Sequence, residues 1–141
     1  MNLRIIPALV ALLSLVPLAF AALPITAIKD LQKKAPDQVV IEVLDSKTNE
    51  KKVSGAFYFY FDVKAKITAI DRSASGLKIG DEIRIKYSRP NIDKTPAAGD
   101  WAGGVDKGKS YTAHLKPVAG KAGNFDPAAA SGTFVEVKKK P

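Results

Sequence analysis

A long run of alternating residues between positions 57 and 70 constrains the fold more than any other feature of this sequence. Its odd positions are all apolar and its even positions are mostly polar, so one side of an extended chain would be wholly apolar. Such alternation is typical of an antiparallel strand with one buried and one solvated face. The run is long for a single strand, so we expect strong curvature or a β-bulge within it. The apolar face consists of Phe57, Phe59, Phe61, Val63, Ala65, Ile67 and Ala69.

The rest of the chain predicts further strands separated by irregular connections. Apolar side chains recur at a helical spacing between prolines in residues 24–36, which predicts a short helix there. Residues 45–50 are polar and predict a turn, and Leu77 and Ile79 are expected to point inward from a surface connection. The other predicted strands are 38–44, 83–88, 110–118 and 133–137. Together the strands predict a core of Phe57, Phe59, Phe61, Val63, Ile67, Ile83, Ile85 and Leu115.

Five strands with one or two short helices predict a mainly β fold, a small antiparallel barrel or sandwich. The stretches Ala65–Ile70 and Ser75–Ile85 resemble the second-to-third-strand region of OB-like barrels, particularly the netrin-like variety. Lys107–Leu115 is similar to the strand that follows there, so the resemblance covers residues 57–118. The chain also resembles small exported bacterial proteins of that shape whose role is not established. The resemblance implies a five-stranded OB-like barrel, but the inhibitory site of eukaryotic netrin-like domains requires cysteine, which this chain lacks.

The amino terminus has the three parts of a secretory signal peptide in residues 1–21. Arg4 supplies the positive charge, an apolar stretch follows, and the small residues Ala19 and Ala21 precede the expected cleavage point after Ala21. A permanent anchor is the alternative, because no charge appears between Arg4 and Lys29, but prolines interrupt that stretch. We expect cleavage and a periplasmic or secreted protein with no stable membrane span. Residues 22–141 would then form a single domain with a basic C-terminal tail.

Several kinds of chemistry are excluded by composition. The chain has no cysteine, which excludes disulfides, thiolate metal sites and cysteine nucleophiles. Its single histidine, His114, falls on the outward face of a predicted strand and excludes a histidine cluster. Asp93, Asp100 and Asp106 flank a long connection, but their spacing does not resemble a calcium loop. We therefore expect no enzyme, no metal and no cofactor.

Basic and aromatic side chains fall on the polar face of consecutive predicted strands. OB barrels bind ligands across this face, where a basic groove lies beside aromatic stacking surfaces. Lysines of this kind also simply face water and protect strand edges, and both interpretations stay open. The only tryptophan lies in the Pro/Gly/Asp-rich connection 89–109, a length typical of functional or disordered loops, where it either caps the core or anchors a ligand. The candidate ligand-binding residues are Tyr58, Tyr60, Lys64, Lys66, Arg84, Lys86 and Trp101.

These observations favour an exported binding or accessory protein of the bacterial cell envelope. We expect it to recognise a protein or an anionic surface or polymer, in keeping with its formal net charge of +8. The alternative is binding of nucleic acid or another polyanion through the basic, tyrosine-bearing face. Export makes nucleic acid the less favoured of these partners.

Overall fold

The computed structural model describes residues 23–139, so the predicted signal peptide at 1–21 lies outside the described residues. The described part is mainly β, as predicted, with one α-helix, α1 (Ile25–Lys34), where the sequence predicts it. A short 3-10 turn, η1 (Ala130–Gly132), lies near the C-terminal end. The strands are β1 (Asp37–Val53), β2 (Ala56–Ser73), β3 (Glu82–Pro90), β4 (Ser110–Pro117), β5 (Asn124–Pro127) and β6 (Phe134–Glu136).

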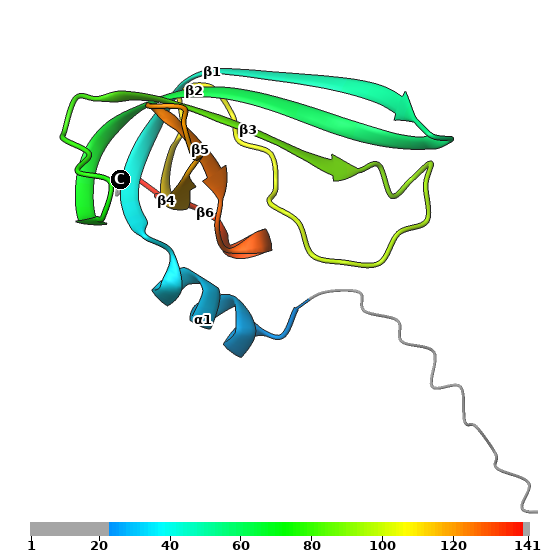
Figure 1. The fold of residues 1–141 in the computed structure, drawn as a ribbon, viewed down its shortest axis with the longest axis horizontal. Coiled ribbons are helices and arrows are strands. Elements are labelled where there is room, and N and C mark those ends of the chain that lie inside the picture. Colours follow the sequence, from blue (N-terminus) through cyan, green and yellow to red (C-terminus); the bar gives the residue numbers. More distant parts are fainter. Residues whose placement is uncertain (1–22, 140–141) are drawn as a thin grey trace, which may run out of the picture.

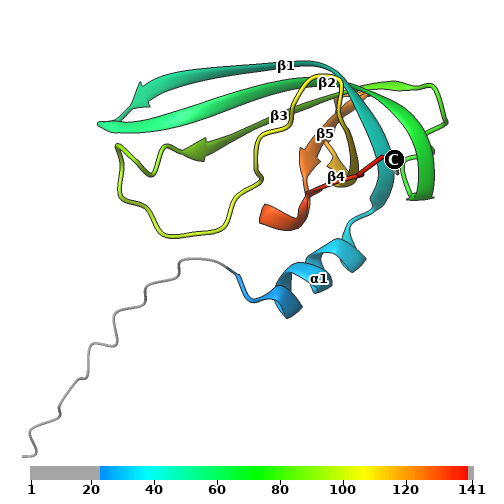
Figure 2. The same ribbon diagram turned by 180° about the vertical axis from the view of Figure 1, so that it is seen from behind.

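Five of the strands close into a ring. The six strands form one sheet in the order β1-β2-β3-β5-β4-β6, and β1 also pairs with β4. All pairings are antiparallel except the short parallel contact between β3 and β5. Figures 1 and 2 show the ring with α1 at one end of it, while β1, β2 and β3 continue well beyond the ring on one side.

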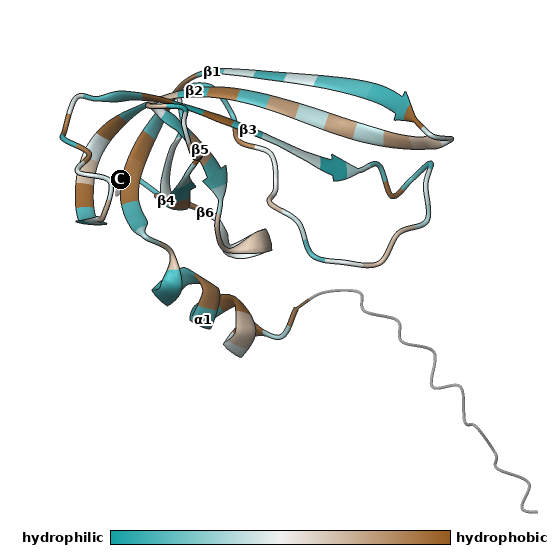
Figure 3. Cartoon of the chain, in the orientation of Figure 1, coloured by the Kyte–Doolittle hydropathy of each residue, from teal (hydrophilic) through white to brown (hydrophobic). Residues whose placement is uncertain are grey.

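The core lies inside the ring, and β2 contributes to it through Val63, Ala65 and Ile67, which are fully buried. The register between β1 and β2 shifts at three places, which confirms the irregularity expected in so long a strand. Brown and paler segments alternate along the curved part of β2 in Figure 3. Phe57 and Phe59, however, are only half-buried, so their predicted place in the core is wrong. The reason is that the first residues of β2, up to about residue 62, project beyond the ring.

The turn predicted at 45–50 is also wrong. β1 continues through these polar residues to Val53, paired with β2 throughout, and the chain reverses only at Ser54 and Gly55. Both turn residues have positive φ, 50° and 84°, as a two-residue hairpin turn requires. A strand that projects from the ring has no buried face to fill, so polar residues are tolerated on both of its sides. The sequence pattern of a turn and that of an exposed strand therefore look alike.

His114 is the third correction, because it is 5% exposed and not on a solvated face. The segment that follows β5 covers the outer side of β4 here. The His114 N–H donates to the Thr133 carbonyl at 2.8 Å, and the His114 carbonyl accepts from the Ala128 N–H at 3.0 Å. At His114 the strand is thus buried on both faces, which alternation alone does not reveal.

Two smaller differences concern the connections. Leu77 packs against the core as expected, but Ile79 is 69% exposed, because it lies at the corner of a turn in which the Lys78 N–H donates to the Asp81 carboxylate. The short strand β5 was not predicted, since its Asn/Gly/Pro-rich surroundings are typical of a loop. It pairs with β3 on one side and β4 on the other and so completes the ring.

A candidate ligand-binding cleft beneath the extended strands

Three strands continue beyond the ring and form a small sheet, which we call the extension: residues 45–53 of β1, 56–62 of β2 and 86–90 of β3. Its outer face is exposed, and its inner face looks toward the long connection 91–109 (Figure 1). Residues opposite each other in the strand register share a face. Glu50, Phe59 and Arg89 therefore form one row across the inner face.

The start of the long connection is fixed to the extension by hydrogen bonds. The Glu50 carboxylate accepts from the Lys94 ammonium at 2.6 Å and from the Asn91 amide at 2.8 Å. These two bonds, the one from Lys94 above all, hold the pKa of Glu50 below its usual range. The Phe57 N–H donates to the Thr95 hydroxyl at 2.8 Å. Further along, the Tyr87 hydroxyl donates to the Gly103 carbonyl at 2.6 Å, so the connection is held at both ends of the extension.

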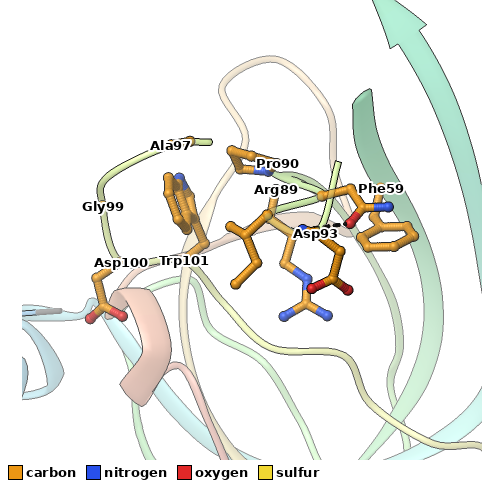
Figure 4. Close-up of a pocket in the computed structure, with 10 residues that line it drawn as sticks. Phe59, Arg89, Pro90, Asp93, Ala97, Gly99, Asp100 and Trp101 are labelled. Carbon is orange, nitrogen blue, oxygen red and sulfur yellow. Dashed lines mark hydrogen bonds between the residues drawn. The ribbon is translucent and has the colours of Figure 1, made fainter. Parts of the chain in front are cut away.

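Between the extension and this connection lies a cleft of about 520 Å³. Figure 4 shows the Trp101 ring on one side of it and Arg89 and Phe59 on the other. The position of the Trp101 ring requires a glycine at residue 99. A Cβ there would lie 2.6 Å from the ring, and Gly99 has a φ of +150°. The cleft is lined by Phe59, Arg89, Pro90, Asn91, Ile92, Asp93, Ala97, Gly99, Asp100 and Trp101.

Arg89 is the most unusual group in the cleft. Its guanidinium carbon lies 5.8 Å from the centre of the Phe59 ring and 5.4 Å from that of Phe61. Its Nε is the one buried side-chain nitrogen or oxygen between residues 23 and 139 that has no hydrogen-bond partner. The carboxylate in its own row, Glu50, is already bound to Lys94 and Asn91. A guanidinium held on two aromatic rings without an acid keeps its capacity to bind an anion.

Acidic groups are present at the cleft, but none forms an ion pair with Arg89 within 4.0 Å in the described residues. Asp100 accepts a hydrogen bond from the Ser131 hydroxyl at 2.8 Å. Asp93 is exposed, and its carboxylate lies on the same side of the cleft as Arg89 (Figure 4). The cleft therefore offers one cation held over aromatic rings, two aromatic surfaces and an acidic rim.

Sequence reasoning missed Arg89, although a signal for it exists. The inward positions of β3 are Ile83, Ile85 and Tyr87, and continuing this alternation places Arg89 on the same inward face. A charged residue on an otherwise apolar strand face is the signal for it in the sequence.

The predicted site residues are divided between the two faces of the sheet. Trp101 lines the cleft on the inner side, whereas the other six lie on the outer face of β2 and β3, as the strand register shows. Two cations of this outer set are paired with acids: Arg84 with Asp62 at 3.0 Å and Lys64 with Glu82 at 3.5 Å. Lys66 and Lys86 form no ion pair within the described chain. The outer residues are Tyr58, Tyr60, Lys64, Lys66, Arg84 and Lys86.

Across residues 23–139, no group of three or more His, Asp or Glu side chains is arranged to hold a metal ion. No helix in that range combines the length and the apolar character needed to cross a membrane. No protein-family model matches the chain, and no curated protein or solved structure matches it either.

Proposed function

We propose that this protein is an exported, non-enzymatic binding protein of the bacterial cell envelope that recognises an anionic group of its partner in the cleft beneath the extension. The observation that carries the proposal is Arg89, whose guanidinium lies over the Phe59 and Phe61 rings and forms no ion pair within the described residues. A guanidinium without an acid partner has N–H groups left to donate, so a carboxylate or phosphate that enters the cleft would form charge-assisted hydrogen bonds with it.

The remaining parts of this proposal have separate support. The proposed location depends on the signal-peptide features of residues 1–21. We also propose that the ring of five strands is an OB-like barrel of the netrin-like kind, which the number of strands and the closing pair of β1 with β4 support. On this interpretation the ring is the scaffold, and the extension with its cleft carries the binding groups.

Trp101 makes the proposal testable before the natural ligand is identified, because it is the only tryptophan and it lines the cleft. We would titrate the protein with N-acetylphenylalanine and with the corresponding amide, and follow tryptophan fluorescence. The acid should bind in preference to the amide, and Arg89→Gln should weaken its binding roughly tenfold or more, the usual effect of losing a charged hydrogen bond.

Arg84→Gln is the matched control, because Arg84 lies on the outer face and is paired with Asp62. It should bind the acid as the wild type does. Equal affinity of the wild type and Arg89→Gln, or equal binding of acid and amide, would contradict the proposal.

A second candidate function is polyanion binding through the outer face, favoured by the register that brings two tyrosines and four basic residues together on it. Its ion pairs leave fewer free cations than the sequence suggests. Heparin binding measured at several salt concentrations distinguishes the two sites. If the outer face binds, Lys66→Ala with Lys86→Ala lowers the salt slope by roughly 0.7–0.9 per lost contact, whereas Arg89→Gln leaves it unchanged.

A further inference from the structure

One edge of β3 is unpaired beside the cleft. β3 pairs with β2 along its whole length, but its other edge meets β5 only at Arg84 and Ile85. From Lys86 onward no strand of the described chain lies against that edge. An unpaired strand edge presents N–H and C=O groups that are free to accept another strand.

Hydrogen bonds on either side of β3 show which groups face this edge. The Arg84 N–H donates to the Gly123 carbonyl, away from β2, whereas the Asn91 N–H donates to the Phe57 carbonyl of β2. Because backbone groups alternate in direction along a strand, the even-numbered residues face away from β2. The free edge therefore presents the N–H and C=O groups of Lys86 and Ser88, and both of these residues are exposed.

Charge and shape around the edge indicate what would pair with it. Lys86 lies on the outer face and Arg89 on the inner face, and neither forms an ion pair within the described residues. Ile92, which is 64% exposed, and the Trp101 ring add apolar surface in the adjoining cleft. A strand laid along this edge would place alternate side chains beside Lys86 and beside Arg89, so acidic residues on either face would be favoured.

We infer that the free edge of β3, residues 86–90, binds an extended acidic segment of a partner protein as an added strand, with an acidic side chain on Arg89. This inference rests on the proposed function, because it uses the same cleft, and it adds the class of ligand. A second copy of this chain fits less well, since two molecules of net charge +8 would bring lysines and arginines together. Strand addition of this kind gives affinity through the backbone and specificity through alternate side chains.

The probe is a six-residue peptide of alternating threonine and glutamate, blocked at both ends, with Trp101 fluorescence as the readout. Ser88→Pro removes one N–H of the free edge, and proline is tolerated where a strand N–H has no partner. We expect this variant to lose roughly tenfold or more in affinity, the effect of losing a bound backbone donor beside a proline ring. Ser88→Ala keeps the N–H and should bind as the wild type does.

Thr48→Pro is the matched control at the other free edge of the extension. The backbone N–H and C=O groups of Phe61 point toward β3, so those of Tyr60 and Asp62 point toward β1. They pair with Asn49 and Lys47 of β1. The N–H of Thr48, which lies between these two residues, therefore points away from β2. This variant removes an equivalent free donor at the opposite edge, on a residue that does not line the cleft, and should bind the peptide normally. If Ser88→Pro and Thr48→Pro weaken binding equally, the inference is overturned.

N-methylation of the peptide keeps the inference testable even if Ser88→Pro does not fold. Methyl groups on one alternate set of peptide amides should abolish binding to the wild-type protein, and those on the other set should be tolerated. Equal effects of both sets would overturn strand addition of a partner. Dimerisation of the protein through this edge would also overturn it, and would be shown by a wild-type dimer that becomes a monomer in Ser88→Pro.

The outcomes separate this inference from the proposed function. If the small acid requires Arg89 but the peptide is insensitive to Ser88→Pro and to N-methylation, the cleft function stands and strand addition is wrong. If the peptide is lost in Ser88→Pro but bound normally by Arg89→Gln, strand addition stands and the anion function of Arg89 is wrong.

Discussion

A single residue can be polar in the sequence and yet belong to the interior, as His114 shows. Alternation along residues 110–118 places it outside, but the segment 128–133 covers that face and the Nδ1 atom lies 3.3 Å from the Thr133 carbonyl. Burial lowers the pKa of His114 below its ordinary 6.5, against the smaller opposing effect of the Thr133 carbonyl. The neutral imidazole is thus the form that the fold prefers.

This preference predicts a pH dependence of stability. The pKa of His114 is lower in the folded protein than in the unfolded chain, where it is near 6.5, so protonation favours unfolding. Its contribution to the free energy of unfolding is present above about pH 6.5 and is lost as the pH falls through the folded-state pKa. The urea midpoint of the wild type should therefore be lower at about pH 5.5 than at about pH 7.5. This decrease should be smaller in His114→Gln.

Glu50→Gln serves as the control for this prediction. The Glu50 carboxyl titrates below its ordinary value of 4.5, so it stays ionised across that pH window. The difference between the urea midpoints at the two pH values should be the same in this variant as in the wild type, even if both midpoints are lower. If the urea midpoint of His114→Gln depends on pH as strongly as that of the wild type, the imidazole of His114 is not the group that causes the pH dependence.

At the scale of elements, the sequence predicts the alternation of buried and exposed residues along a strand. It does not predict contacts that depend on segments far away in the chain. The alternation of β2 was sufficient to place Val63 and Ile67 in the core and to require a bulge. It contains no information on where the strand leaves the ring, because Phe59 and Phe61 look the same in the sequence. The cleft was missed for a related reason: it forms only when the connection 91–109 folds back under the extension.

The change in environment along β2 gives a second prediction. Phe61 is 6% exposed and its ring stacks on Tyr87 with centroids 4.6 Å apart, whereas Phe59 is half-buried in the cleft wall. Phe61→Ala should lower the free energy of unfolding by about 3–5 kcal/mol, the range for a buried phenylalanine. Phe59→Ala should cost about 1–2 kcal/mol, because less apolar area is withdrawn from water there.

Chemical denaturation of both variants tests this difference. Tyr58→Ala, on the outer face of the same strand, controls for the loss of an aromatic residue from the hairpin. A Phe59→Ala variant as unstable as Phe61→Ala would mean that the core extends into the hairpin. Phe59→Ala should in addition weaken anion binding, since its ring supports the Arg89 guanidinium.

On the scale of the whole molecule, the buried core and the proposed binding groups lie in different parts. The ring holds a buried cluster that includes Val39, Ile41, Ile67, Ile85 and Leu115. The extension offers two open edges, an aromatic inner face and a cation without an ion pair in the described residues. Substitutions in the proposed binding surface should therefore leave the core intact, because the residues that fill the core lie elsewhere. The same division explains why the fold class follows from the sequence more readily than the site does.

The last prediction concerns processing of the chain. Cleavage after Ala21 would leave few residues before α1, which begins at Ile25. The contacts that anchor this helix lie after the cleavage point: Gln32 donates to the Gly132 carbonyl at 2.9 Å, and Arg72 donates to the Ala35 carbonyl at 3.1 Å. A protein that starts at residue 22 should therefore fold with the stability of the full chain. Intact-mass measurement of protein recovered from the cell envelope should give residues 22–141, and a mass that retains residues 1–21 would instead support a permanent anchor.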